Sequence, residues 1–180
     1  MATTIDIHGY NGSSESNWHP RLKELLVESG ETVIAPDFPG GRSPVYTQWE
    51  PIIANALEQS DDLVTMIGHS LGTRALIRFL EEHDIQIDRG VLVGPFANWT
   101  SNASFRDGAY ANFFDRELNI AKVRDMAKEW IVIGSLDDSR IPFEQSEVIA
   151  SELGARLVAV PDSDHFLDEK WADLIVEELS

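Results

Sequence analysis

The stretch Gly68-His69-Ser70-Leu71-Gly72 is a Gly-x-Ser-x-Gly motif placed between two apolar segments. The run before it, residues 63–67, has the length and composition of a buried strand, whereas Leu71, Ala75 and Phe79 recur at helical spacing after it. A serine in a tight turn between a buried strand and a helix is typical of a nucleophile elbow, where glycines omit Cβ atoms that would collide. We therefore predict that Ser70 is a nucleophile that attacks a carbonyl carbon.

A serine hydroxyl becomes a good nucleophile only when an imidazole removes its proton and a carboxylate orients that imidazole. The candidate base is His165, and the adjacent residues Asp137 and Asp138 are both candidates for the acid. The chain order Ser, Asp, His is that of α/β-hydrolases. The residues alone leave the choice between the two aspartates open, because either spacing suits the role.

The negative oxygen formed by the attack needs N–H donors already in place. The backbone N–H of Leu71, directly after the nucleophile, is one predicted donor, and Tyr10 in the loop after the first strand is the best candidate for the other. We expect His8 to support that loop. His69 is predicted to be structural and to point away from the site, and we interpret His19 and His83 as ordinary residues of helical regions.

These side chains must be positioned by strands that alternate with helices. Apolar runs predict six strands, at residues 3–7, 32–35, 63–67, 90–94, 130–134 and 157–160. Helical spacing predicts the connecting helices, among them one with Pro51 near its start, one over residues 116–127 and a closing helix that contains Trp171. The alternation predicts one α/β domain over residues 1–180, with a six-stranded parallel sheet and helices on both faces. In such a sheet ligands bind at the carboxyl ends of the strands, where the polar clusters lie.

Residues 95–115 interrupt this alternation, and loops of that length often form lids or binding surfaces. The segment is rich in aromatic side chains, which are predicted to line an apolar acyl or aryl pocket. These candidates are Trp99, Phe105, Tyr110, Phe113 and Phe114. For any single member, ordinary core packing is an equally good interpretation.

Composition excludes several other classes of function. The 180 residues carry a formal net charge of −17 and no basic block, which argues against nucleic acids and anionic membrane surfaces as partners. There is no cysteine, no run long enough to span a membrane and no signal-like start, so we expect a cytoplasmic protein.

Two cofactor-dependent alternatives are disfavoured. A metal site built from His8, Asp137, Asp138, Asp164 and His165 would lack helical His-x-x-x-His spacing and thiolate ligands. The loop at residues 9–12 does not match the Gly-x-Gly-x-x-Gly pattern of dinucleotide sites. We therefore expect neither a metal nor another cofactor.

Three stretches resemble the small serine hydrolases of the retinoblastoma-binding protein nine and YdeN type: residues 68–72, residues 134–138 with Pro142, and residues 162–166. The resemblance covers essentially the whole chain, and its short length fits an α/β-hydrolase fold without a large cap domain. It implies Ser70 as nucleophile, His165 as base and, four residues before Pro142, Asp138 as the acid.

Two departures from this family stand out. A chain without cysteine cannot contain the Leu-x-Cys-x-Glu motif through which the mammalian namesake binds its partner, and Asp164 stands where a glycine often precedes the histidine. The resemblance implies hydrolysis of carboxylic esters or amides of small substrates. We predict an esterase that works through an acyl-enzyme; the alternatives are an amidase or aminopeptidase and a non-catalytic binding protein that retains the fold. The sequence does not predict the physiological substrate, acyl-chain length or oligomeric state.

Overall fold

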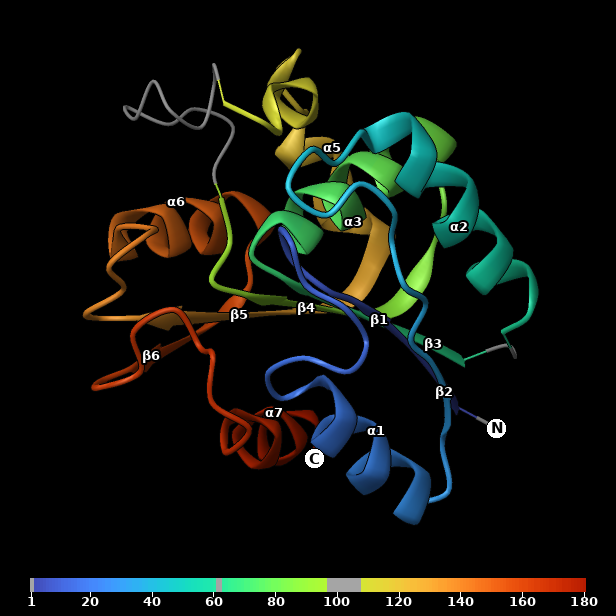
Figure 1. The fold of residues 1–180 in the computed structure, drawn as a ribbon, viewed down its shortest axis with the longest axis vertical. Helices are drawn as coiled ribbons and strands as arrows, with labels where there is room; N and C mark the ends of the chain where they lie inside the picture. The colour runs from blue at the N-terminus through green and yellow to red at the C-terminus, as the bar shows by residue number, and fades with distance from the viewer. Residues whose placement is uncertain (1, 61–62, 97–107) are drawn as a thin grey trace.

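The computed structural model describes residues 2–60, 63–96 and 108–180. These residues form one parallel sheet with the strand order β2-β1-β3-β4-β5-β6 (Figure 1). The strands are β1 Ala2–Ile7, β2 Thr32–Ile34, β3 Leu63–His69, β4 Ile87–Val93, β5 Ala127–Ser135 and β6 Arg156–Val160.

Helices cover both faces of this sheet (Figure 1). One face carries α1 His19–Glu28 and α7 Trp171–Leu179. The other carries α2 Tyr46–Glu58, α3 Leu71–His83, α5 Ile120–Val123 and α6 Phe143–Leu153. This arrangement confirms the predicted six-stranded parallel sheet with helices on both faces.

The central strands divide their side chains between two apolar cores. Val132 of β5 packs into the core under α2, α3 and α6, whereas its neighbours Ile131 and Ile133 pack into the core under α1 and α7. Side chains of a strand alternate between the faces of the sheet, so a strand covered on both faces must be apolar throughout. This requirement explains the uninterrupted apolar runs in the sequence.

Two predicted details were wrong. Pro51 lies inside α2, which begins at Tyr46, where the backbone N–H donates a hydrogen bond to the side chain of Asn112. The predicted helix over residues 116–127 is only the four-residue α5 followed by a 3₁₀ turn. Ala127, the last residue of the expected helix, pairs with Ile87 of β4 and is the first residue of β5.

The turn between β3 and α3 has the tight geometry predicted for an elbow. Ser70 has a φ of +52°, in the left-handed region that non-glycine residues rarely adopt. A Cβ atom on Gly72 would lie 2.2 Å from the backbone oxygen of Ile7, and one on Gly68 would lie 2.8 Å from the backbone oxygen of Gly72. Both glycines are therefore required by the close approach of strand and helix.

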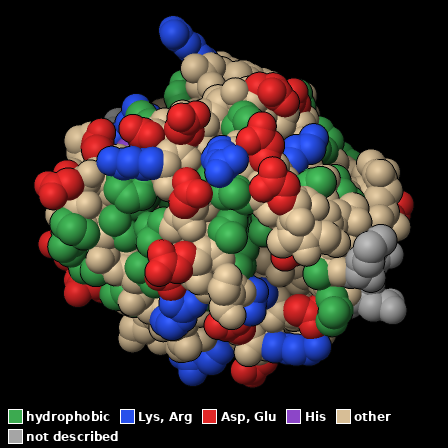
Figure 2. Space-filling view, turned by 90° about the horizontal axis from the view of Figure 1, so that it is seen from below, with side chains coloured by type: hydrophobic (Ala, Val, Ile, Leu, Met, Phe, Trp, Pro, Cys, Tyr) green, Lys and Arg blue, Asp and Glu red, His purple; other side chains and the backbone are tan. Residues whose placement is uncertain are grey.

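Charge on the surface is mixed. On the face shown in Figure 2, seen from the side of α1 and α7, Lys and Arg side chains are scattered among Asp and Glu. Among the described residues, no helix is long and apolar enough to cross a membrane.

Candidate active site

Three side chains from three loops at the carboxyl ends of the strands form a chain of hydrogen bonds. Nε2 of His165, after β6, lies 2.8 Å from Oγ of Ser70, and Nδ1 of the same ring lies 2.7 Å from Oδ2 of Asp138, after β5. Ser70 is 7% exposed, and the side chains of His165 and Asp138 are 3% and 2% exposed. The chain of hydrogen bonds is therefore shielded from water except at the serine.

The two adjacent aspartates have different partners. Asp138 directs Oδ2 to His165, while its Oδ1 accepts hydrogen bonds from the backbone N–H groups of Arg140 and Ile141, both at 2.8 Å. Asp137 instead contacts the loop of residues 162–166, which carries the histidine, and the backbone N–H of Ser163 is the main reason that its carboxyl pKa is lowered. Of the pair, only Asp138 is hydrogen-bonded to the imidazole.

Asp164, the residue before the histidine, adopts a φ of +43°. Aspartate tolerates this left-handed conformation better than most residues. Its Oδ1 accepts a hydrogen bond from the backbone N–H of Ser139 at 2.9 Å, and contact with Ser139 lowers the pKa of the Asp164 carboxyl. The residue thus adds a second tie between the loop after β5 and the loop after β6.

His69 supports the loop that carries His165. Its Nε2 lies 3.0 Å from the backbone oxygen of His165, and the two rings pack with centroids 5.3 Å apart. Burial keeps the pKa of His69 well below its ordinary value, so the ring is neutral and donates from Nε2 to that oxygen. The residue has a structural contact, as predicted, but it also borders a hollow beside Ser70 rather than pointing away from the site.

His8 connects the loop after β1 to the loop after β2. Its Nε2 accepts a hydrogen bond from the backbone N–H of Phe38 at 3.0 Å, so Nδ1 carries the proton and donates to the backbone oxygen of Gly9 at 2.8 Å. Burial lowers the pKa of His8, which favours this neutral form. These contacts hold the backbone that leads into Tyr10.

Two hollows flank Ser70. The first, here called the aromatic hollow, has a volume of about 50 Å³ and is lined by Tyr10, Ser70, Leu71, Phe96, Tyr110, Arg140, Ile141 and His165. The second, here called the glycine hollow, has a volume of about 40 Å³ and is lined by Gly9, Tyr10, Gly12, Asn17, His69, Ser70, Arg140, His165 and Leu167.

Both predicted oxyanion donors border the aromatic hollow. Leu71 is the first residue of α3, where a backbone N–H has no partner within its own helix. Tyr10 borders both hollows, and its ring packs against Tyr110 with centroids 4.9 Å apart. Their role as donors stays a prediction.

The predicted aromatic pocket residues occupy different places. Tyr110 lines the aromatic hollow, together with Phe96, which was not among the predicted pocket residues. Phe113 is fully buried in the core between α2 and α3. Phe114 packs against that core and lies under the guanidinium of Arg74. The candidates Trp99 and Phe105 lie outside the described residues.

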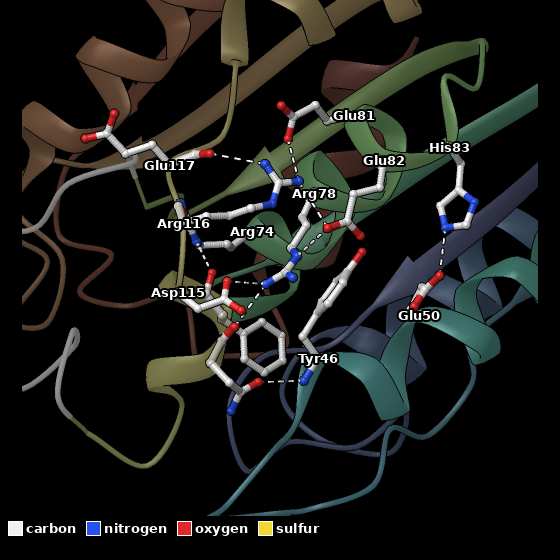
Figure 3. Close-up of polar contacts among 12 residues, drawn as sticks. Tyr46, Glu50, Arg74, Arg78, Glu81, Glu82, His83, Asp115, Arg116 and Glu117 are labelled. Atoms are coloured by element: carbon white, nitrogen blue, oxygen red, sulfur yellow. Dashed lines mark hydrogen bonds and ion pairs between the residues drawn. The ribbon is translucent and has the colours of Figure 1, made fainter.

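Two arginines of α3 hold the segment that contains Tyr110 (Figure 3). Arg74, one helical turn after Ser70, donates to the backbone oxygens of Phe113 at 2.5 Å and Arg116 at 2.8 Å. Arg78, one turn further, donates to the backbone oxygen of Asn112 and pairs with Asp115, at 2.9 Å and 2.8 Å. The helix that follows Ser70 therefore also positions a wall of the aromatic hollow.

A buried histidine–carboxylate pair was missed by the sequence analysis. Nδ1 of His19 lies 2.7 Å from Oδ2 of Asp6, and both side chains are 1% exposed. The sequence did contain a signal for this pair, because Asp6 lies in a predicted buried strand and a buried carboxylate needs a polar partner. His83, also interpreted as an ordinary helical residue, lies at the surface and contacts Glu50 (Figure 3).

No group of three or more His, Asp or Glu side chains in the described part of the chain is arranged to hold a metal ion. Asp137, Asp138 and Asp164 instead accept hydrogen bonds from backbone N–H groups, and Asp138 also contacts His165.

Comparison with known proteins identifies what this chain is similar to. The family model described as serine hydrolase matches residues 4–172. YdeN of Bacillus subtilis (strain 168) is 30% identical over 166 residues, which cover 91% of this chain and 85% of that protein. Serine hydrolase RBBP9 of Rattus norvegicus is 27% identical over 175 residues, which cover 97% and 91% of the two chains.

The fold is matched by a solved structure. The crystal structure of the YdeN gene product from B. subtilis superposes with a TM-score of 0.88 at 27% identity, covering 99% of this chain and 97% of that one.

Proposed function

The chain belongs to the serine hydrolase family, and from this membership and the geometry around Ser70 we propose that it hydrolyses carboxylic esters of small substrates through an acyl-enzyme intermediate. The observation that carries the proposal is the pair of hydrogen bonds on the His165 ring, to Ser70 at 2.8 Å and to Asp138 at 2.7 Å.

The tautomer that suits these contacts assigns each residue a role. A carboxylate is only an acceptor, so Nδ1 of His165 carries a proton donated to Asp138, which leaves Nε2 free to accept the Ser70 proton. The imidazolium formed during attack is then stabilised by the buried carboxylate of Asp138. Asp138 can hold this position because two backbone N–H groups bind its other oxygen.

In the first half of the reaction, Ser70 Oγ attacks the ester carbonyl carbon while its proton passes to His165. The tetrahedral oxyanion is stabilised by the backbone N–H groups of Leu71 and Tyr10. When the tetrahedral species collapses, the carbon–oxygen bond to the alcohol breaks and His165 returns the proton to the departing oxygen. Water, activated by the same imidazole, then hydrolyses the acyl-serine.

The hollows support substrates of limited size on both sides of the nucleophile. The aromatic hollow offers the rings of Phe96 and Tyr110 to an apolar acyl or aryl group. The glycine hollow has a slightly smaller volume, and its lining, which includes Gly12 and Asn17, is more polar. We propose a small-molecule ester as the substrate, with no nucleic acid or membrane partner.

The test combines a fluorophosphonate probe with p-nitrophenyl acetate. Ser70→Ala should abolish labelling, and both Ser70→Ala and His165→Ala should lower kcat by roughly a millionfold. Ser151→Ala is the control, because Ser151 is exposed on α6, away from the site. Wild-type protein that neither reacts with the probe nor hydrolyses the ester would refute the proposal, and so would full activity in Ser70→Ala.

A further inference from the structure

Arg140 is a cationic side chain at the mouth of the site that the proposed chemistry does not use. It borders both the aromatic hollow and the glycine hollow, and among the described residues it shares this position only with Ser70, His165 and Tyr10. A group that occupies either hollow therefore lies near Arg140. The backbone N–H of Arg140 donates to Oδ1 of Asp138 at 2.8 Å, which fixes the main chain from which the side chain extends.

The guanidinium of Arg140 is exposed and makes no ion pair with any carboxylate of the described residues. Most other described arginines are engaged: Arg78 pairs with Glu82 and Asp115, and Arg116 with Glu81 and Glu82. In a chain with a net charge of −17, a cation left unpaired beside the nucleophile is conspicuous. It offers a binding partner to an anionic group of a substrate.

The positive charge of Arg140 contributes to the pKa shifts of two residues that line the hollows. Burial contributes most to the low pKa of His69, and the positive charge of Arg140 lowers it further. Burial raises the pKa of Tyr110, and the same positive charge opposes that rise. The guanidinium therefore acts on the linings of both hollows.

We propose that Arg140 is a specificity-determining residue that binds a carboxylate of the substrate, so that the preferred esters are monoanionic. A guanidinium matches the two oxygens of a carboxylate with two parallel hydrogen bonds. The single positive charge of Arg140 matches the charge of one carboxylate, whereas a phosphate dianion would require further donors. This inference rests on the proposed ester hydrolysis and names its substrate class.

The experiment compares charged esters with neutral isosteres. Carboxylate on the alcohol side is tested with 4-acetoxybenzoate against 4-acetoxybenzamide, and carboxylate on the acyl side with mono-4-nitrophenyl adipate against 4-nitrophenyl hexanoate. Arg140→Gln should lower kcat/KM for the anionic member of at least one pair by about tenfold, through KM, and leave the neutral esters unchanged. Arg140→Lys should restore part of the loss. Lys23→Gln, which removes an exposed positive charge on α1, should change neither member.

Equal effects of Arg140→Gln on charged and neutral esters would overturn the inference while leaving ester hydrolysis intact. A binding measurement separates the two proposals if no ester is hydrolysed. Calorimetric titration of benzoate into Ser70→Ala protein should give a Kd about tenfold tighter than in Ser70→Ala with Arg140→Gln. Identical affinities in the two proteins, or no binding to either, would also overturn it.

Discussion

Asp137 Oδ1 accepts a hydrogen bond from the backbone N–H of Ser163 at 3.0 Å, so the first aspartate of the pair ties the loop after β5 to the loop that carries His165. The same oxygen also accepts a hydrogen bond from the hydroxyl of Ser135. Asp138, the next residue, contacts the imidazole directly. Adjacent side chains of one type thus have separable tasks, one fixing the distance between two loops and the other orienting the proposed base.

Substitution of the two aspartates should separate these tasks. Asp138→Asn should lower kcat by roughly ten-thousandfold, because an amide no longer selects the reactive tautomer or stabilises the imidazolium. Asp137→Asn keeps an acceptor for the Ser163 N–H and should retain most of the activity, while Asp137→Ala should lower the Tm. Ester kinetics and thermal melts of the three variants check this. A larger loss of kcat in Asp137→Asn than in Asp138→Asn would contradict the assignment.

Stability should fall as the pH is lowered below 6.5. Burial lowers the pKa of both His69 and His8 in the folded protein from an ordinary value of 6.5. Above pH 6.5 these rings are neutral in both states. Below it the unfolded chain takes up protons that the folded protein excludes, so the free energy of unfolding decreases by up to about 1.4 kcal/mol per pH unit for each ring.

Urea unfolding between pH 8 and pH 5 measures this dependence. His69→Gln keeps a donor for the backbone oxygen of His165 but does not titrate, so its free energy of unfolding should decline less steeply below pH 6.5 than that of the wild type. Identical slopes in the two proteins would show that His69 does not contribute.

Removal of Arg74 should destabilise the protein through the segment it holds. The side chain is 1% exposed, and burial lowers its pKa to about 10, so it remains charged at neutral pH. Arg74→Met would leave the backbone oxygens of Phe113 and Arg116 without this donor and should cost about 2–4 kcal/mol.

The control is Arg21→Met, because the Arg21 side chain is 41% exposed and its removal should change stability by no more than about 0.5 kcal/mol. Denaturant melts provide the comparison, and KM for aryl esters should rise in Arg74→Met because Tyr110 loses its support. Similar stabilities of the two variants would argue against a role for the buried guanidinium.

The sequence predicted the elements that local spacing controls. The apolar run before Ser70 and the helical repeat after it were sufficient to predict β3 and α3. The turn between them could be predicted because its steric requirement, two positions without a Cβ atom, is met by two glycines within five residues. Prediction failed at the ends of an element. The helix expected over residues 116–127 begins only after its N-cap Asn119 and ends at Val123, and Ala127 instead pairs with Ile87 as the first residue of β5.

The sequence by itself therefore determined the order of strands and helices and the residue types of the site, because periodicity and turn chemistry act over neighbouring residues. Spacing left open which aspartate contacts His165, and the structure shows the contact with Asp138 that the family resemblance implied. Only the tertiary structure decided that His19 pairs with buried Asp6 and that Arg140 borders both hollows. Each of these contacts joins residues from separate loops or elements, and spacing along the chain does not encode the direction in which a loop presents its side chains.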